Sequence, residues 1–128
     1  MRSAKEEGPK ILVVDDDQVL CEMMKRILEE EGGQVQTAGS IREGLEKARK
    51  EAPELVFLDL RMPGGDGIQF LKRFRKFQGE VPVYILTGHA DLQSAQSALK
   101  LGATEYLAKP ISIKQLKKIV RDWGKVPA

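Results

Sequence analysis

Residues 55–67, LVFLDLRMPGGDG, decide how the chain folds. The first four are apolar without a break, which is typical of a strand covered on both faces inside a parallel sheet. The run ends at Asp59, and the proline and glycines that follow predict a tight turn. An acid in this position lies in the crevice where open α/β sheets bind ligands. On this stretch alone, a carboxylate that merely caps the turn is an equally good interpretation.

The composition is that of one globular domain. The chain has 128 residues, 41% hydrophobic and 31% charged, enough to bury a single core without a disulfide or a metal. Its 21 basic and 19 acidic residues leave a net charge of +2, which is too balanced to indicate direct nucleic-acid binding. The lone Cys21 predicts a buried thiol in a reducing compartment. Because no run has the length of a membrane span or the pattern of a signal peptide, we expect a cytoplasmic protein that does not associate with membranes.

Polar residues 1–8 predict a flexible N-terminal extension, and residues 9–128 form a single predicted domain. Four runs besides residues 55–58 predict strands, at 11–14, 34–38, 81–86 and 104–107. Asp17 and Ser40 stand where the first two helices would be capped. Apolar residues recur at helical spacing after each strand, from Val19 to Leu28, Ile41 to Ala48, Ile68 to Phe77, Leu92 to Leu99 and Ile113 to Trp123.

The alternation of five strands and five helices, with short connections, predicts parallel strands joined by right-handed helical crossovers. We therefore expect an α/β, flavodoxin-like, doubly wound (βα)5 fold. Its five-stranded parallel sheet would have the order 2-1-3-4-5, because this order leaves the polar strand at 34–38 on one edge. The first and third strands are then neighbours, so Asp15, Asp16 and Asp59 converge at one edge of the sheet. Thr87 and Lys109 end the next two strands.

The residue types gathered at this edge predict phosphoryl chemistry. Three carboxylates would repel one another at neutral pH unless a cation held them, and Mg²⁺ prefers such oxygen ligands. With the cation bound, a phosphoryl group can approach Asp59, which would act as nucleophile and form an aspartyl phosphate. Thr87, Lys109 and the amide of Gly88 would then donate to the phosphoryl oxygens.

From about Pro9 onward, the chain resembles the receiver domains of two-component response regulators. Each motif that carries the resemblance is weak alone, but together, in order and at strand ends, they are specific. The resemblance implies a phosphoprotein of a phosphorelay, in which Asp59 accepts a phosphoryl group from a sensor histidine kinase or a phosphotransfer protein in a Mg²⁺-dependent reaction. The motifs are Val14-Asp15-Asp16, Leu58-Asp59-Leu60-Arg61-Met62-Pro63, Thr87-Gly88 and Lys109-Pro110.

Carried over by position, the resemblance also implies the ligands of the metal. Asp59, Asp16 and the backbone carbonyl of Arg61 would bind Mg²⁺, with Asp15 behind a water molecule. Gly65 departs from the family pattern, in which a larger apolar residue stands in the loop after the phosphoacceptor. This departure predicts a more mobile loop.

The phosphoryl contacts and the switch follow from the same resemblance. Thr87 and Lys109 would contact the phosphoryl oxygens, and the peptide bond between Lys109 and Pro110 would be cis. Tyr106 would swing inward as Thr87 moves. A strand aromatic that simply packs at the sheet edge explains Tyr106 equally well.

The expected function is a switch that changes the surface formed by the fourth helix, fifth strand and last helix. That surface would bind a protein target or an attached effector domain, with the receiver as a monomer or a phosphorylation-dependent dimer. We expect no enzyme activity beyond phosphorylation and dephosphorylation of its own aspartate.

The alternative is a receiver-like interaction module that works without phosphorylation. A metal-dependent phosphatase fits less well because the chain has no room for a cap domain, and a flavodoxin because three acids would repel a flavin phosphate.

Overall fold

The computed structural model describes the backbone of residues 8–62, 65–88 and 92–123. The N-terminal extension predicted for residues 1–8 lies, apart from Gly8, outside the described residues. The elements follow one another as β1 (Lys10–Val14), α1 (Gln18–Glu30), β2 (Gln34–Ala38), α2 (Ile41–Lys50), β3 (Leu55–Asp59), β4 (Arg61–Met62), β5 (Gly65–Asp66), α3 (Gly67–Phe77), β6 (Val83–Thr87), α4 (Leu92–Lys100), β7 (Glu105–Ala108) and α5 (Ile113–Asp122).

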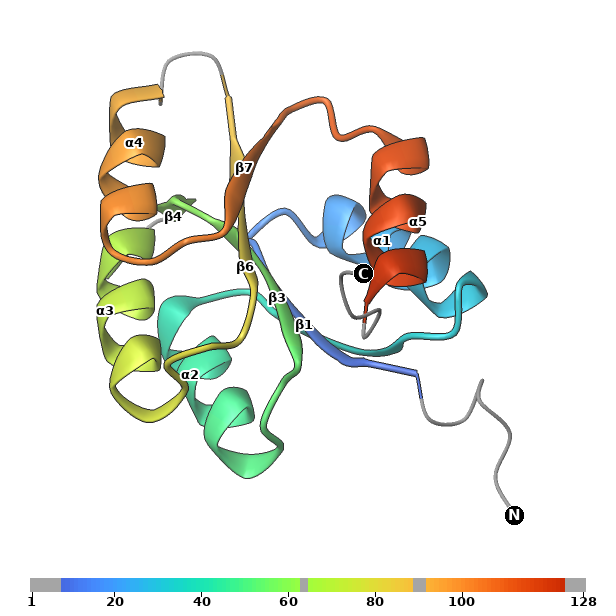
Figure 1. The fold of residues 1–128 in the computed structure, drawn as a ribbon, viewed down its shortest axis with the longest axis horizontal. Helices are drawn as coiled ribbons and strands as arrows, with labels where there is room; N and C mark the ends of the chain where they lie inside the picture. Colours follow the sequence, from blue (N-terminus) through green and yellow to red (C-terminus); the bar gives the residue numbers. More distant parts are fainter. Residues whose placement is uncertain (1–7, 63–64, 89–91, 124–128) are drawn as a thin grey trace, which may run out of the picture.

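The centre of the molecule is a five-stranded parallel sheet in the order β2-β1-β3-β6-β7. In Figure 1, α2, α3 and α4 cover one face of this sheet, and α1 and α5 cover the other. This is the doubly wound, flavodoxin-like arrangement that the alternation of strands and helices predicts. Polar β2 lies at one edge and β7 at the other, as expected for the strands with the fewest apolar residues.

The numbering of the strands differs from the predicted 2-1-3-4-5. Two residues on either side of the turn after β3 pair as a short antiparallel hairpin, β4 with β5, which stands apart from the main sheet. This hairpin was not predicted from the sequence, in which a glycine-rich loop was expected after β3 and a helix from about Asp66. Within the main sheet, β6 and β7 take the places expected for the fourth and fifth strands.

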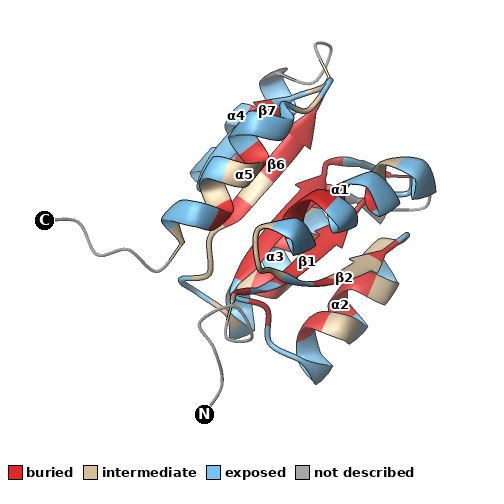
Figure 2. Ribbon diagram, turned by 90° about the vertical axis from the view of Figure 1, so that its right-hand side faces the viewer, coloured by how far each residue is buried: buried red, intermediate tan, exposed pale blue. Residues whose placement is uncertain are grey.

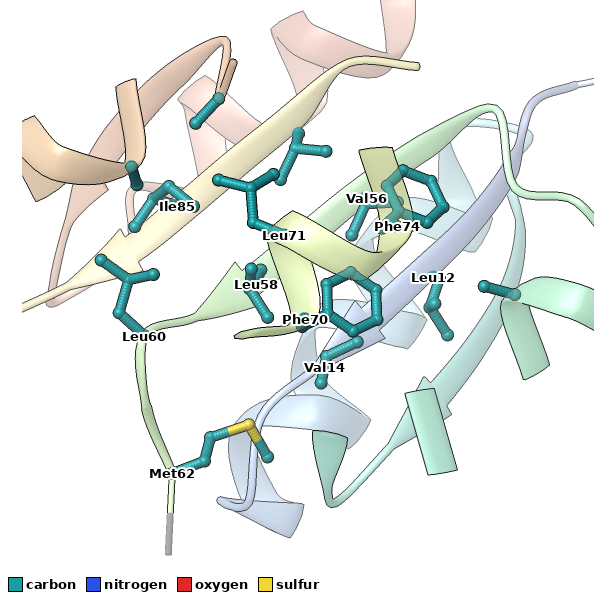
Figure 3. Packing of buried hydrophobic residues seen from close by; sticks show 14 of the residues in the cluster. Leu12, Val14, Val56, Leu58, Leu60, Met62, Phe70, Leu71, Phe74 and Ile85 are labelled. Carbon is teal, nitrogen blue, oxygen red and sulfur yellow. The ribbon is translucent and has the colours of Figure 1, made fainter. Parts of the chain in front are cut away.

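Two apolar cores lie on opposite faces of the sheet, because successive residues of a strand point to opposite faces. Figure 2 shows the sheet as the most buried layer of the molecule. In Figure 3, Phe70, Leu71 and Phe74 of α3 lie over Val14 and Val56, the α3 face of β1 and β3. The opposite core joins α1 and α5 to the remaining strand residues, among them Ile11, Val13, Leu55 and Phe57. Burial on both faces explains why β1 is apolar from Ile11 to Val14 and β3 from Leu55 to Leu58, directly before Asp15 and Asp59.

The predicted helix caps are present. Asp17 caps α1 by accepting a hydrogen bond from the amide of Leu20, and Ser40 caps α2 in the same way from Glu43. Several residues of the predicted apolar stripes are exposed instead, namely Val19, Met23, Phe77, Leu99 and Ile113. The most exposed are Val19, with 79% of its surface accessible, and Ile113, with 48%. Both stand in the first turn of their helix, past the end of the preceding strand.

Among the helices of the described ranges, none is both long enough and apolar enough to cross a membrane.

Gly67 determines how closely α3 approaches the end of β3. Its amide donates to the carbonyl of Leu60 at 3.1 Å. A Cβ at this position would lie 2.5 Å from the Cα of Leu60 and 2.8 Å from the carbonyl oxygen of Asp59. Both are backbone atoms, so a side chain is accommodated only if the segment that carries Asp59 moves.

We therefore expect Gly67→Ala to lower the free energy of unfolding by about 1–3 kcal/mol, the usual cost of overpacking, and to shift the amide resonances of Asp59 and Leu60. Urea unfolding and a ¹H–¹⁵N correlation spectrum measure the two effects. Gly79→Ala is the matched control, because a Cβ on Gly79 meets no atom within 4 Å. Equal stability of the two variants would contradict this account of Gly67.

Candidate functional site

The candidate site lies at the carboxyl edge of the sheet, where β1 and β3 end side by side. Parallel pairing brings Val14 opposite Leu58, so the residues that follow, Asp15 and Asp59, emerge at the same level. This is the topological switch point, because the chain leaves β1 toward α1 on one face and β3 toward α3 on the other. Carboxylate oxygens of Asp15, Asp16 and Asp59 lie within 4.8 Å of one another.

Asp15 is completely buried. One carboxylate oxygen accepts a hydrogen bond from the amide of Asp17 at 2.9 Å, and the other lies 3.2 Å from the ammonium of Lys109. The backbone of Asp15 is also fixed, because its amide donates to the carbonyl of Ala38 on β2 at 3.0 Å. These contacts hold the β1–α1 turn in one conformation, with the side chain of Asp16 on its exposed side.

Asp59 is the last residue of β3 and is 6% exposed. Its Oδ1 accepts a hydrogen bond from the amide of Arg61 at 3.0 Å, and its Oδ2 lies 3.5 Å from the ammonium of Lys109. Burial raises the pKa of Asp59 above its ordinary value, and the neighbouring Asp15 carboxylate adds to this effect. The Arg61 amide and the Lys109 ammonium lower the pKa of Asp59, but they do not cancel the increase that burial causes.

Lys109 bridges the two buried carboxylates from the loop after β7. Burial works against the charged form of Lys109, but the attraction of Asp15 and Asp59 outweighs it, so the pKa of this ammonium is raised. The backbone of Lys109 is held by a hydrogen bond from its amide to the carbonyl of Thr87, at 2.7 Å. The Lys109–Pro110 peptide bond is cis, as the resemblance implies.

Thr87 ends β6 beside Asp59 and is buried. Its hydroxyl donates to the carbonyl of Gly88 at 3.1 Å rather than to a carboxylate. Tyr106 stands on edge strand β7, opposite Ile85 of β6, and 40% of its surface is exposed. The Thr87 hydroxyl thus binds the backbone of the next residue, and the Tyr106 ring lies at the surface.

The structure adds a contact that sequence reasoning missed. Cys21 was predicted to be buried, and it is; its thiol also donates to the backbone carbonyl of Asp15 at 3.2 Å. Burial, together with the charge of Asp15, raises the pKa of this thiol to about 11, so the group is a neutral donor at physiological pH. The position of Cys21, one helical turn after the acids, was the available signal, but spacing alone does not reveal a hydrogen bond.

Comparisons with known proteins identify the family. A family model described as the response regulator receiver domain matches residues 11–121. Sporulation initiation phosphotransferase F of Bacillus subtilis is 34% identical over 114 residues, which cover 89% of this chain and 92% of that protein. Transcriptional regulatory protein ZraR of Klebsiella oxytoca is 39% identical over 110 residues, and there the chain spans only 25% of the relative.

Solved structures give the same result. The receiver domain of NtrX from Brucella abortus superposes with a TM-score of 0.82 at 33% identity, over 88% of this chain and 95% of that one. A response regulator receiver domain from Clostridium thermocellum gives a TM-score of 0.82 at 37% identity, over 88% and 91% of the two chains. With its fold, its strand-end acids and these matches taken together, the chain belongs to the receiver domain family of two-component response regulators.

Proposed function

We propose that this receiver domain takes a phosphoryl group onto the carboxylate of Asp59 in a Mg²⁺-dependent reaction. The donor would be the phosphohistidine of a sensor kinase or of a phosphotransfer protein. The observation that carries the proposal is the group of three carboxylates, Asp15, Asp16 and Asp59, with the ammonium of Lys109 bridging two of them. A structural role alone does not explain why so much negative charge is gathered at a partly buried edge.

The donor set fits a hard divalent cation. Mg²⁺ takes oxygen ligands and is usually held by one or two carboxylates together with phosphate oxygens. Asp16, which is exposed, and Asp59 would hold it, with the backbone carbonyl of Arg61 as a further ligand and Asp15 through water. When bound, the cation would neutralise part of the carboxylate charge and bind a phosphoryl oxygen.

The residues of the chain supply the rest of the chemistry. An oxygen of Asp59 attacks phosphorus while the phosphorus–nitrogen bond of the donor histidine breaks, and the product is an acyl phosphate. Lys109 already lies beside Asp59 and would move its ammonium to a phosphoryl oxygen. The hydroxyl of Thr87 would leave the carbonyl of Gly88 for a second oxygen, and the amide of Gly88 would donate to the same group.

The reorientation of Thr87 is the step that would carry the signal outward. Thr87 and Ala108 face each other on β6 and β7, so a shift at Thr87 reaches the strand that holds Tyr106. An inward turn of the exposed Tyr106 ring would change the surface of α4, β7 and α5. A phosphoryl group that favours one arrangement by a few kcal/mol suffices to move the population.

The output follows one of two routes seen among the relatives. Sporulation initiation phosphotransferase F is by its name a phosphotransfer protein of similar length, whereas the chain covers a quarter of ZraR, a transcriptional regulator. The domain would therefore either pass its signal to a separate protein or control further domains of a longer protein. In both cases the chain acts on its own aspartate and has no separate substrate. The cytoplasmic location inferred from the sequence stays a prediction.

Incubation with acetyl phosphate and Mg²⁺ should add the mass of one phosphoryl group to the intact protein. We expect no adduct when EDTA replaces Mg²⁺ and none in Asp59→Asn. Asp17→Asn is the matched control, because Asn caps a helix as well as Asp does, so this variant should be phosphorylated. An adduct that survives in Asp59→Asn would contradict the assignment of the phosphoacceptor. Absence of an adduct in every sample would favour the phosphorylation-independent interaction module.

Asp59→Asn should also raise the free energy of unfolding of the metal-free protein at pH 7. The folded-state pKa of Asp59 is raised, so ionisation destabilises the fold as pH rises from the ordinary aspartate pKa through the folded-state pKa. The difference from wild type should therefore be present at pH 7, shrink as pH falls toward 4 and shrink when Mg²⁺ is added.

Urea unfolding in EDTA at several pH values measures this effect. Glu80→Gln, a change at an exposed acid away from the site, is the control and should leave stability near that of wild type. Lower stability of Asp59→Asn than of wild type at pH 7 without divalent cation would show that the ionised carboxylate stabilises the fold, against our account.

A further inference from the structure

A cavity opens at the amino-terminal edge of the sheet, on the face that α5 covers and at the opposite end of the strands from the three acids. Its volume is about 440 Å³. Ligand sites in proteins have volumes of roughly 300 to 1,000 Å³, so this space is large enough for a small organic molecule. The residues that carry the argument below are Tyr84, Glu105, Gln115, Lys118, Asp122 and Trp123.

The cavity exists because α5 packs toward α1 and leaves the amino ends of β6 and β7 uncovered. Leu116 and Val120 of α5 are buried in the same core as Met24 of α1. Arg121 also donates to both carboxylate oxygens of Glu31, at 2.8 and 3.2 Å, which ties α5 to the end of α1. Figure 1 shows the two helices side by side. The side of α5 that lines the cavity is largely polar, with Gln115, Lys118 and Asp122.

Two aromatic rings form part of the wall. The ring of Tyr84 stacks on the fully buried ring of Phe57, with the centroids 5.6 Å apart and the planes at 25°, so its position is fixed by the core. Trp123, the only tryptophan of the chain, ends α5 and lines the same cavity. Glu105 of β7 is paired in register with Tyr84 of β6, so the two side chains leave the same face of the sheet.

The wall of the cavity carries more negative than positive charge. Its one ammonium, that of Lys118, lies 2.6 Å from a carboxylate oxygen of Asp122 and is already paired. No residue of the described ranges forms an ion pair or a hydrogen bond with the side chain of Glu105. Burial raises the pKa of Tyr84, and the charges of Glu105 and Asp122 add to the increase, so its ring is that of a neutral phenol at physiological pH. The second carboxylate therefore has no cation in the structure.

We propose that this cavity binds a small organic cation, an ammonium group on an aromatic body. The ammonium would pair with the carboxylate of Glu105, and the faces of Tyr84 and Trp123 would contact the apolar body and the cation. A neutral molecule of the same shape would gain only the apolar contacts. Because the cavity lies at the opposite edge of the sheet from Asp59, this binding does not depend on the proposed phosphorylation.

Titration of the wild-type protein with 2-phenylethylamine tests the proposal, with Mg²⁺ present to occupy the acids at the carboxyl edge. ¹H–¹⁵N NMR should show saturable shifts at Tyr84, Glu105 and Trp123 at millimolar amine, and Trp123 fluorescence should change in parallel. 2-Phenylethanol, which has the same shape without the charge, should bind at least tenfold more weakly.

Three results of this titration would overturn the proposal. The first is equal affinity for the amine and the alcohol, and the second is the absence of saturable shifts at the cavity. The third is a set of shifts at Tyr84, Glu105 and Trp123 when protein concentration alone is raised, because a second copy of the chain would then be the occupant.

Two variants that change the charge of the wall in opposite directions complete the test. Glu105→Gln should weaken the binding of 2-phenylethylamine about fivefold, and Lys118→Gln should strengthen it about threefold, the scale of partly exposed ion pairs. A change that merely disturbed the fold would weaken binding in both.

Glu46→Gln is the matched control. It removes the same charge at an exposed position of α2, on the other face of the sheet, and should leave the affinity unchanged. Unchanged affinity in Glu105→Gln, or weaker binding in Lys118→Gln, would overturn the assignment of the cation site.

Discussion

The bridge that Lys109 makes between Asp15 and Asp59 is the interaction on which the site depends. It places an ammonium 3.2 Å from one buried carboxylate and 3.5 Å from another, and Asp16 adds a third acid within reach of the same point. The backbone helps to hold these charges in place, because the amides of Asp17 and Arg61 donate hydrogen bonds to the two buried carboxylates. A cation and a phosphoryl group would together complete this arrangement, because they bring the charges of both signs that it can bind.

The topology of the sheet makes the bridge possible. Asp15 and Lys109 are 94 residues apart in the chain, yet parallel strands deliver both to one edge. The same edge is the place where β1 and β3 send their connections to opposite faces, which leaves the crevice uncovered. The two apolar cores keep the strands in register, so packing on both faces sets the relative positions of the three acids. The packing that stabilises the fold therefore also determines the geometry of the site.

Much of this could be predicted from the sequence, because the decisive signals are continuous or local. The unbroken apolar runs at 11–14 and 55–58 predicted strands buried on both faces, and topology then brought their terminal acids together. The β4–β5 hairpin was missed because each strand has two residues, too short for any periodic pattern. The hydrogen bonds from Arg75 to the carbonyl of Gly102 and from the thiol of Cys21 to the carbonyl of Asp15 join separate elements or turns. They depend on tertiary structure, which local sequence patterns do not specify. The direction of the Thr87 hydroxyl depends on a rotamer, which no sequence pattern specifies.

The most direct test of the central claim, that these carboxylates form a cation-dependent site, is a titration of the wild-type protein with Mg²⁺ followed by ¹H–¹⁵N NMR. The account predicts saturable shifts at millimolar Mg²⁺ for the amides of Asp16, Asp17 and Arg61. The amide resonances of Leu55 and Val83, which lie at the amino-terminal ends of β3 and β6, should not shift. Absence of saturable shifts at the carboxyl edge, or equal shifts at both edges, would contradict it.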